Sequence, residues 1–155
     1  MEKRGPIYLY TDGASSGNPG PGGWGAVLIY GDLRKELSGG FSLTTNNRME
    51  LLAIIEGLSA IKWAGAEVVV VSDSKYVVET VNKGWKRKKN QDLWQRFDEV
   101  SAGFRLRFEW IKGHNGHPLN ERCDALATAA AALPDLPEDS GYSAEQTVSV
   151  NNIFG

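Results

Sequence analysis

The sequence predicts an α/β domain with a mixed five-stranded sheet, in which three antiparallel strands lead, parallel strands are added later, and helices cover both faces. Two observations support this fold class. Residues 7–12 (IYLYTD) and 68–73 (VVVVSD) are apolar runs closed by a hydroxyl residue and an aspartate, which is typical of strands buried on both faces. The segments between and after them follow the order β-β-β-α-β-α-α-β-α, which favours one sheet with helical connections.

The early part of the chain contains a predicted hairpin. Residues 24–30 and 33–41 read as strands joined by Gly31-Asp32, and two-residue connections of this kind favour antiparallel pairing. A glycine- and proline-rich loop is expected over residues 13–23. Because this loop lacks the Gly-Lys-Ser/Thr ending of a phosphate-binding loop, it either approaches a polymer ligand closely or simply leads into the hairpin.

The later elements are predicted from caps, periodicity and turn residues. A set of cap residues at 44–47 opens a helix that runs to Trp63 and is closed by Gly65. After the strand at 68–73, we expect two helices, a half-exposed edge strand and a last helix, at 74–81, 90–102, 105–111 and 118–133. The polar, proline-punctuated end suggests one domain over residues 1–142 and a C-terminal tail over residues 143–155, in which residues 147–150 could add a short strand.

Composition narrows the class of protein. The chain has 155 residues, 41% hydrophobic and 23% charged, which is ordinary for one globular domain. It has no stretch long enough for a membrane span and no apolar leader, and its single cysteine cannot form an internal disulfide. We therefore expect a cytoplasmic monomer. The net charge of −2 means that any attraction for nucleic acid must come from a local patch.

Two carboxylates stand at equivalent positions in the two buried strands. If these strands are parallel neighbours, Asp12 and Asp73 emerge at the carboxyl edge of the sheet, where open α/β sheets bind ligands. Carboxylates about 5 Å apart repel by roughly 3 kcal/mol at an effective dielectric near 20. The pair must therefore share a proton or hold a cation.

Two further carboxylates could join this pair. Glu50 lies on the apolar face of the first helix, so it is either a capping glutamate or an inward-facing ligand. Asp124 shares one face of the last helix with Asn120 and Thr128, and is either a solvent-facing charge or a fourth ligand. Four carboxylates without soft ligands suit a hard divalent cation such as Mg²⁺.

The two histidines precede the last helix. His114 and His117 have the spacing of a zinc pair, but one cysteine and no other histidine leave too few ligands for zinc. His114, flanked by glycine, suits proton transfer or product release beside a carboxylate site. His117 is interpreted as a turn residue before Pro118.

The segment 83–89 carries five basic residues around Trp85, and Trp94 follows shortly after. Such runs are usually solvated surface. Interleaved aromatic residues raise the chance of a nucleic-acid groove, because phosphates pair with the charges and sugars or bases stack on the rings.

Taken together, the motifs resemble ribonuclease H of type 1 in its bacterial form, over residues 7–142 and in matching order. The residues that carry the resemblance are Tyr10-Thr11-Asp12-Gly13, Asn18-Pro19-Gly20-Pro21-Gly22-Gly23, Thr45-Asn46-Asn47-Arg48-Met49-Glu50, Ser72-Asp73-Ser74, Asp92-Leu93-Trp94, Lys112-Gly113-His114 and Asn120-Glu121-Arg122-Cys123-Asp124. The resemblance implies a ribonuclease H-like fold and hydrolysis of the RNA strand of RNA–DNA hybrids, such as primers and R-loops, leaving 3′-hydroxyl and 5′-phosphate ends. It implies two Mg²⁺ ions, with Mn²⁺ as an alternative, held by Asp12, Glu50, Asp73 and Asp124, and His114 as a mobile helper in turnover.

The resemblance also implies the contacts to the hybrid. Contacts to RNA 2′-hydroxyls map onto Asn18, Asn46 and Asn47, since small amides can both donate to and accept from a hydroxyl. A pocket for a DNA phosphate maps onto Thr45 and Asn90, and the DNA-side channel onto Trp85. We expect the remaining contacts from Lys86, Arg87, Lys88, Lys89, Trp94 and Asn120.

One feature departs from the family pattern. Many relatives carry a longer handle rich in tryptophan and lysine, of which only residues 84–91 remain here, so we expect weaker and salt-sensitive hybrid binding. Two other classes compete with a nuclease. A non-cleaving hybrid-binding module is expected to lack one or more of the four carboxylates, and an aspartyl phosphatase needs an Asp-x-Asp pattern, which is missing after Asp12.

Overall fold

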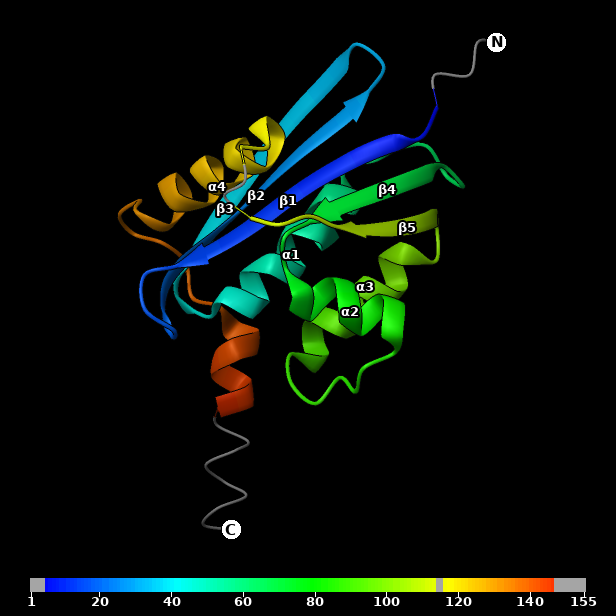
Figure 1. Ribbon diagram of the computed structural model, residues 1–155. Helices are drawn as coiled ribbons and strands as arrows, with labels where there is room; N and C mark the ends of the chain where they lie inside the picture. The colour runs from blue at the N-terminus through cyan, green and yellow to red at the C-terminus, as the bar shows by residue number, and fades with distance from the viewer. Residues whose placement is uncertain (1–4, 114–115, 147–155) are drawn as a thin grey trace.

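The computed structural model describes residues 5–113 and 116–146 and has a five-stranded sheet with strand order β3-β2-β1-β4-β5 (Figure 1). The strands are β1 (Ile7–Ser15), β2 (Gly20–Tyr30), β3 (Leu33–Thr44), β4 (Glu67–Ser72) and β5 (Arg105–Trp110). β1, β2 and β3 are antiparallel neighbours, whereas β4 pairs in parallel with both β1 and β5. The predicted fold class and element order are confirmed.

Helices cover both faces of this sheet (Figure 1). α1 (Asn46–Ser59), α2 (Lys75–Lys83) and α3 (Gln91–Ser101) lie on one face, and α4 (Pro118–Ala131) packs across β1, β2 and β3 on the other. The core between the sheet and α1 is apolar and closed, with Leu9, Ile54 and Leu58 fully buried. The burial of this core holds the carboxyl ends of β1 and β4 against the first turns of α1.

Local capping explains where the helices begin. Thr45 Oγ1 accepts a hydrogen bond from the Arg48 amide (3.2 Å), and Ser74 caps α2 in the same way. His117 Nδ1 accepts from the Asn120 amide (3.4 Å) at the start of α4, which confirms His117 as a turn residue before that helix. Such caps satisfy amides that have no partner inside the helix.

Two predicted boundaries differ from the structure. α1 ends at Ser59 rather than near Trp63, because the chain turns to bond the loop after α3, with the Gly65 amide donating to the Gly103 carbonyl (2.8 Å). Strands β1 and β2 also run through most of the expected glycine loop. They can do so because glycines let α4 lie directly on β2: a Cβ on Gly23 would overlap the Ala127 carbonyl.

A further helix covers residues 140–146, so the boundary expected after residue 142 falls inside a helix. This segment is tied to the domain by Arg48, which bonds Asp139 (2.7 Å) and Asp92 (2.7 Å) from a position that is only 1% exposed. The strand suggested at 147–150 lies outside the described residues. Within the described part of the chain, no helix is both long and apolar enough to cross a membrane.

Candidate metal centre and nucleic-acid interface

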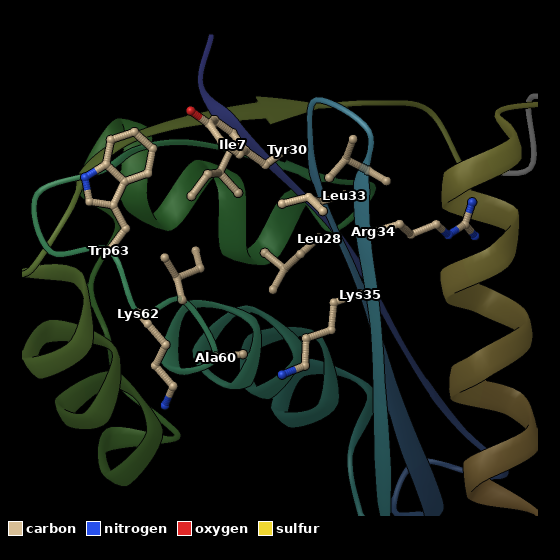
Figure 2. Close-up of a pocket in the computed structure, with 11 residues that line it drawn as sticks. Ile7, Leu28, Tyr30, Leu33, Arg34, Lys35, Ala60, Lys62 and Trp63 are labelled. Carbon is tan, nitrogen blue, oxygen red and sulfur yellow. The ribbon is translucent and has the colours of Figure 1, made fainter. Parts of the chain in front are cut away.

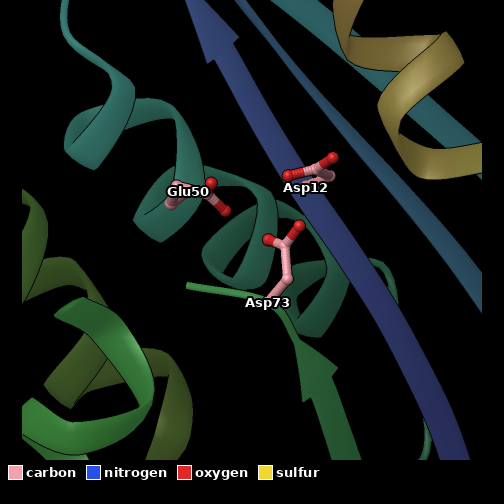
Figure 3. Close-up of side chains that lie close together, drawn as sticks. All are labelled: Asp12, Glu50 and Asp73. Atoms are coloured by element: carbon pink, nitrogen blue, oxygen red, sulfur yellow. The ribbon is translucent and has the colours of Figure 1, made fainter. Parts of the chain in front are cut away.

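Three carboxylates meet at the carboxyl edge of the sheet (Figure 3). Asp12 lies near the end of β1, Asp73 directly follows β4, and Glu50 points toward them from the second turn of α1. One oxygen from each lies within 4.8 Å of one from each of the others. The predicted convergence of these three residues is confirmed.

The strand register and one glycine create this convergence. Thr11 is the register partner of Ser72 in the parallel β1–β4 pair, so the aspartates that follow these residues leave the sheet at the same level. Gly13 then lets α1 approach β1, because a Cβ on residue 13 would overlap the backbone nitrogen of Glu50. The glycine that follows Asp12 therefore sets the position of Glu50.

The three carboxylates repel one another, and no basic side chain of the described residues offsets their charge. Burial, followed by the charge of Asp73, raises the pKa of Asp12 to about 8, although the Gly13 amide donates a hydrogen bond to Asp12 Oδ1 (2.9 Å). Burial, followed by Asp12 and Asp73, raises the pKa of Glu50 well above its usual value. Among the described residues, no lysine or arginine forms an ion pair with the three carboxylates.

The donor set fits a hard divalent cation. The Oε2 atom of Glu50 is shielded from solvent and has no hydrogen-bond partner. Buried carboxylate oxygens normally have partners, because leaving them unpaired is costly. A cation that prefers oxygen ligands, such as Mg²⁺, would coordinate this oxygen and offset the repulsion between the three carboxylates.

The remaining predicted catalytic residues flank the cluster. Asp124 is half-buried on α4, and it lies outside the 4.8 Å group but near enough for its charge to raise the pKa of Asp12 further. His114 lies outside the described residues. Its neighbour Gly113 runs against Asp73, because a Cβ there would lie 2.6 Å from Asp73 Oδ2, so the segment that leads to His114 borders the cluster.

Three predicted contacts to RNA lie together beside Glu50. Asn46 and Asn47 are exposed in the first turn of α1, and Asn18 is exposed in the turn before β2. Asn18 Oδ1 accepts from the Asn46 amide (3.0 Å), and Ser15 Oγ donates to Asn46 Oδ1 (2.8 Å). These bonds hold the two segments in one arrangement next to the carboxylates.

The basic segment between α2 and α3 is only partly available to a ligand. Trp85 and the lysines 86, 88 and 89 are exposed. Arg87, however, donates two hydrogen bonds to Asp98 (2.7 and 2.8 Å) and lies 4.4 Å above the centre of the Trp94 ring. Its charge is therefore already paired within the chain.

Three expected contacts prove to be buried. Trp94 is 2% exposed and donates its indole hydrogen bond to the Tyr76 hydroxyl (3.0 Å). A direct stacking role for Trp94 is therefore wrong, since its ring packs in the core against Phe97. Asn90, at 8% exposed, bonds the same hydroxyl (3.1 Å), and Asn120 is 3% exposed. All three side chains are at most 8% exposed.

Sequence reasoning missed the Arg48 network. Arg48 belongs to the motif that carries Glu50, but its partners are 44 and 91 positions away along the chain, so no local pattern identifies them. It also missed Trp110, whose indole donates to the Asp73 carbonyl (3.0 Å). The sequence does place Trp110 at the end of an edge strand and next to the segment 112–114, and this position could have identified it as a residue near the site.

A separate apolar hollow lies at the opposite end of β1 (Figure 2). It has a volume of about 500 Å³ and is lined by Ile7, Leu28, Ile29, Tyr30, Leu33, Arg34, Lys35, Ala60, Ile61, Lys62 and Trp63. Because no carboxylate lines this hollow and Ile7 is at the far end of the strand from Asp12, it is distinct from the acidic cluster.

Comparisons with known proteins identify the family of the chain. A family model described as RNase H matches residues 4–132. The chain is 52% identical over 149 residues to a ribonuclease H of Aeromonas salmonicida, covering 88% of this chain and 96% of that one. It is 49% identical over 150 residues to a ribonuclease H of Syntrophus aciditrophicus, covering 88% and 86%.

Solved structures give the same result. The N-terminal RNase H domain of a Mycobacterium tuberculosis protein, solved as a fusion with maltose-binding protein, superimposes with a TM-score of 0.73 at 32% identity, covering 81% of this chain and 93% of that one. LC11-RNase H1 in complex with an RNA/DNA hybrid superimposes with a TM-score of 0.70 at 29% identity, covering 81% and 96%. Family model, relatives and fold agree, and the chain belongs to the RNase H family.

Proposed function

We propose that this protein hydrolyses the RNA strand of RNA–DNA hybrids, with two divalent cations held by Asp12, Glu50, Asp73 and Asp124. The observation that carries the proposal is the meeting of three carboxylates within 4.8 Å, one of them with an unpaired buried oxygen. Membership of a family of metal-dependent endoribonucleases supports the same reaction. Mg²⁺ is the proposed ion, and Mn²⁺ the alternative, because both take oxygen ligands.

Each of these residues has a proposed role in the reaction. Asp12 and Asp73, from neighbouring strands, and Glu50, from α1, would hold the cations between them, and Asp124 would add a carboxylate from α4. When bound, a pair of divalent cations lowers the pKa of an attacking water and stabilises the leaving 3′-oxygen. Hydrolysis of this kind would leave 3′-hydroxyl and 5′-phosphate ends. His114 is proposed as the proton helper, since the segment that leads to it borders Asp73.

The substrate class follows from the surroundings of the cluster. The exposed amides of Asn18, Asn46 and Asn47 stand beside Glu50, where a 2′-hydroxyl would distinguish RNA from DNA. The exposed Trp85 and the lysines 86, 88 and 89 offer charge and a ring to the partner strand. The LC11 relative was solved with a hybrid of this type.

We further propose that the protein acts as a cytoplasmic monomer. Its only cysteine, Cys123, is a free and fully buried thiol, which suits a reducing compartment. Sedimentation of the purified protein at micromolar concentration, alone and with hybrid, tests whether the protein is a monomer.

A labelled hybrid tests the reaction directly. The protein is incubated with a duplex whose RNA strand carries a 5′ label, with Mg²⁺ and with Mg²⁺ plus EDTA. We expect short labelled fragments only without EDTA, and none from the same RNA strand as a single strand or paired with RNA. Intact hybrid in Mg²⁺ and in Mn²⁺ would contradict the proposal, and binding without cleavage would identify a hybrid-binding module instead.

A further inference from the structure

Trp110 is an exposed tryptophan fixed against the acidic cluster. It stands at the carboxyl end of β5, and 43% of its surface is exposed. Its indole N–H donates a hydrogen bond to the backbone carbonyl of Asp73 (3.0 Å), so the ring is held at one position relative to that carboxylate. An exposed ring of this kind presents an apolar face beside the proposed reaction centre.

A positive charge lies over the same ring. The ammonium of Lys75 is 5.0 Å from the ring centre of Trp110, within the range of a cation–π contact. Lys75 is exposed as the first residue of α2, two positions after Asp73. Among the described residues, no carboxylate forms an ion pair with Lys75. Its charge therefore remains available to an anion from outside the chain.

We propose that Trp110 and Lys75 form a subsite for the RNA strand next to the cleaved phosphate. In this subsite the indole packs against a ribose or base, and the ammonium pairs with the neighbouring phosphate. The inference rests on the proposed function and adds to it a contact that lies on the β5 side of the cluster, away from the amides on α1.

Charge and geometry favour the RNA strand as occupant. The carboxylates repel a polyanion, so a cation at their margin offsets part of that repulsion for the strand that must come closest. That strand is the one proposed to be cleaved beside Asp73. Trp110 is hydrogen-bonded to the Asp73 carbonyl, and Lys75 follows Asp73 by two positions. Rings stack on bases or sugars without selecting a sequence, as a nuclease of broad sequence tolerance requires.

Binding without divalent cation tests the subsite separately from catalysis. Fluorescence anisotropy with a labelled hybrid in EDTA gives the Kd of the wild type and of Trp110→Ala, Trp110→Phe and Lys75→Gln. We expect Trp110→Ala to raise the Kd about fivefold or more, as loss of one stacked base does. Trp110→Phe should stay within twofold of the wild type because it keeps a ring.

The salt dependence isolates the lysine. Lys75→Gln should raise the Kd and reduce the slope of log Kd against log salt by about 0.7–0.9, the value for one lost phosphate contact. Lys62→Gln and Trp63→Ala are matched controls, since this lysine–tryptophan pair lies at the opposite end of the sheet (Figure 2) and Trp63 is 53% exposed. Both controls should keep the wild-type Kd and slope.

The outcomes are distinguishable. A Kd unchanged within twofold in Trp110→Ala and in Lys75→Gln would overturn the subsite, as would equal weakening in Trp110→Ala and Trp110→Phe, because the N–H rather than the ring would then matter. Lys75→Gln keeps the test valid if Trp110→Ala does not fold. If the wild type binds the hybrid but never cleaves it, the proposed function fails while the subsite can still be measured.

Discussion

Replacing Asp12 by asparagine should stabilise the cation-free protein while abolishing cleavage. The side chain keeps its shape, and its oxygen can still accept the hydrogen bond from the Gly13 amide. What the substitution removes is one negative charge from a cluster that has no basic ion-pair partner among the described residues. A site built for a ligand commonly lowers stability when that ligand is absent.

The expected magnitude follows from the geometry. Two carboxylate charges no more than 4.8 Å apart repel by at least about 3 kcal/mol at an effective dielectric of 20. The upper limit comes from the pKa of Asp12, raised from 3.8 to about 8, which corresponds to about 6 kcal/mol at about 1.4 kcal/mol per unit. A gain of about 3 kcal/mol would raise the Tm by about 6–12 °C in a chain of this length.

The stability gained by Asp12→Asn should increase with pH. Between pH 3.8 and about 8, Asp12 binds its proton in the folded state but releases it in the unfolded chain. The wild type therefore loses stability as pH rises through this window. Because asparagine does not titrate, the stability difference should be near zero at pH 4 and largest at pH 9.

Chemical denaturation in EDTA at pH 4, 6.5 and 9 measures this difference. Asp32→Asn is the matched control, since Asp32 is exposed in the turn between β2 and β3 and should change stability little at any pH. At pH 9 with saturating Mg²⁺, the advantage of Asp12→Asn should shrink, because cation binding stabilises only the folded wild type. Equal stability of the two proteins at pH 9 in EDTA would refute the repulsion on which the metal assignment depends.

Three further substitutions test other parts of the site. Glu50→Gln should reduce cleavage to background while the hybrid Kd in EDTA stays at or below the wild-type value; cleavage at the native rate would exclude Glu50 as a ligand. Gly13→Ala should lower the urea midpoint and reduce the cleavage rate at least tenfold, since its Cβ would overlap the Glu50 backbone. Gly103→Ala, with 3.6 Å to its nearest neighbour, should change neither. Arg48→Met should cost about 3–5 kcal/mol in urea unfolding, because two carboxylates lose their guanidinium, and an unchanged midpoint would show that these ion pairs add no net stability.

The features predicted well from the sequence have local causes. The two apolar runs end in Asp12 and Asp73, and the four consecutive valines of β4 are buried on both faces, as predicted. In β1 only one face is fully buried, because Tyr8 and Tyr10 are half-buried. Cap residues such as Thr45 and Ser74 satisfy amides one turn away. Because strand type, helix starts and the shared sheet edge each depend on neighbouring residues, the three central carboxylates could be placed together before their distances were known.

The features missed depend on long-range packing. Trp94 follows a basic segment, so its composition indicates a ligand surface, yet the hydroxyl of Tyr76 from α2 and the ring of Phe97 enclose it. The tail was expected to begin at residue 143, inside the helix at 140–146, because the sequence is polar there. Its attachment depends on Asp139 reaching Arg48 across 91 positions, which composition does not reveal.

The position of Arg48 explains why the acidic cluster must take its counter-charge from outside the chain. Arg48 is a buried cation only two residues before Glu50, so it is the natural internal partner for the cluster. Its guanidinium instead bonds Asp92 and Asp139, each within 3 Å, and these carboxylates already outnumber its single charge. Recruiting Arg48 to Glu50 would leave both of them unpaired at a cost of several kcal/mol. The fold thus keeps its nearest cation out of the site, so protons or a divalent ion must neutralise the three converging carboxylates.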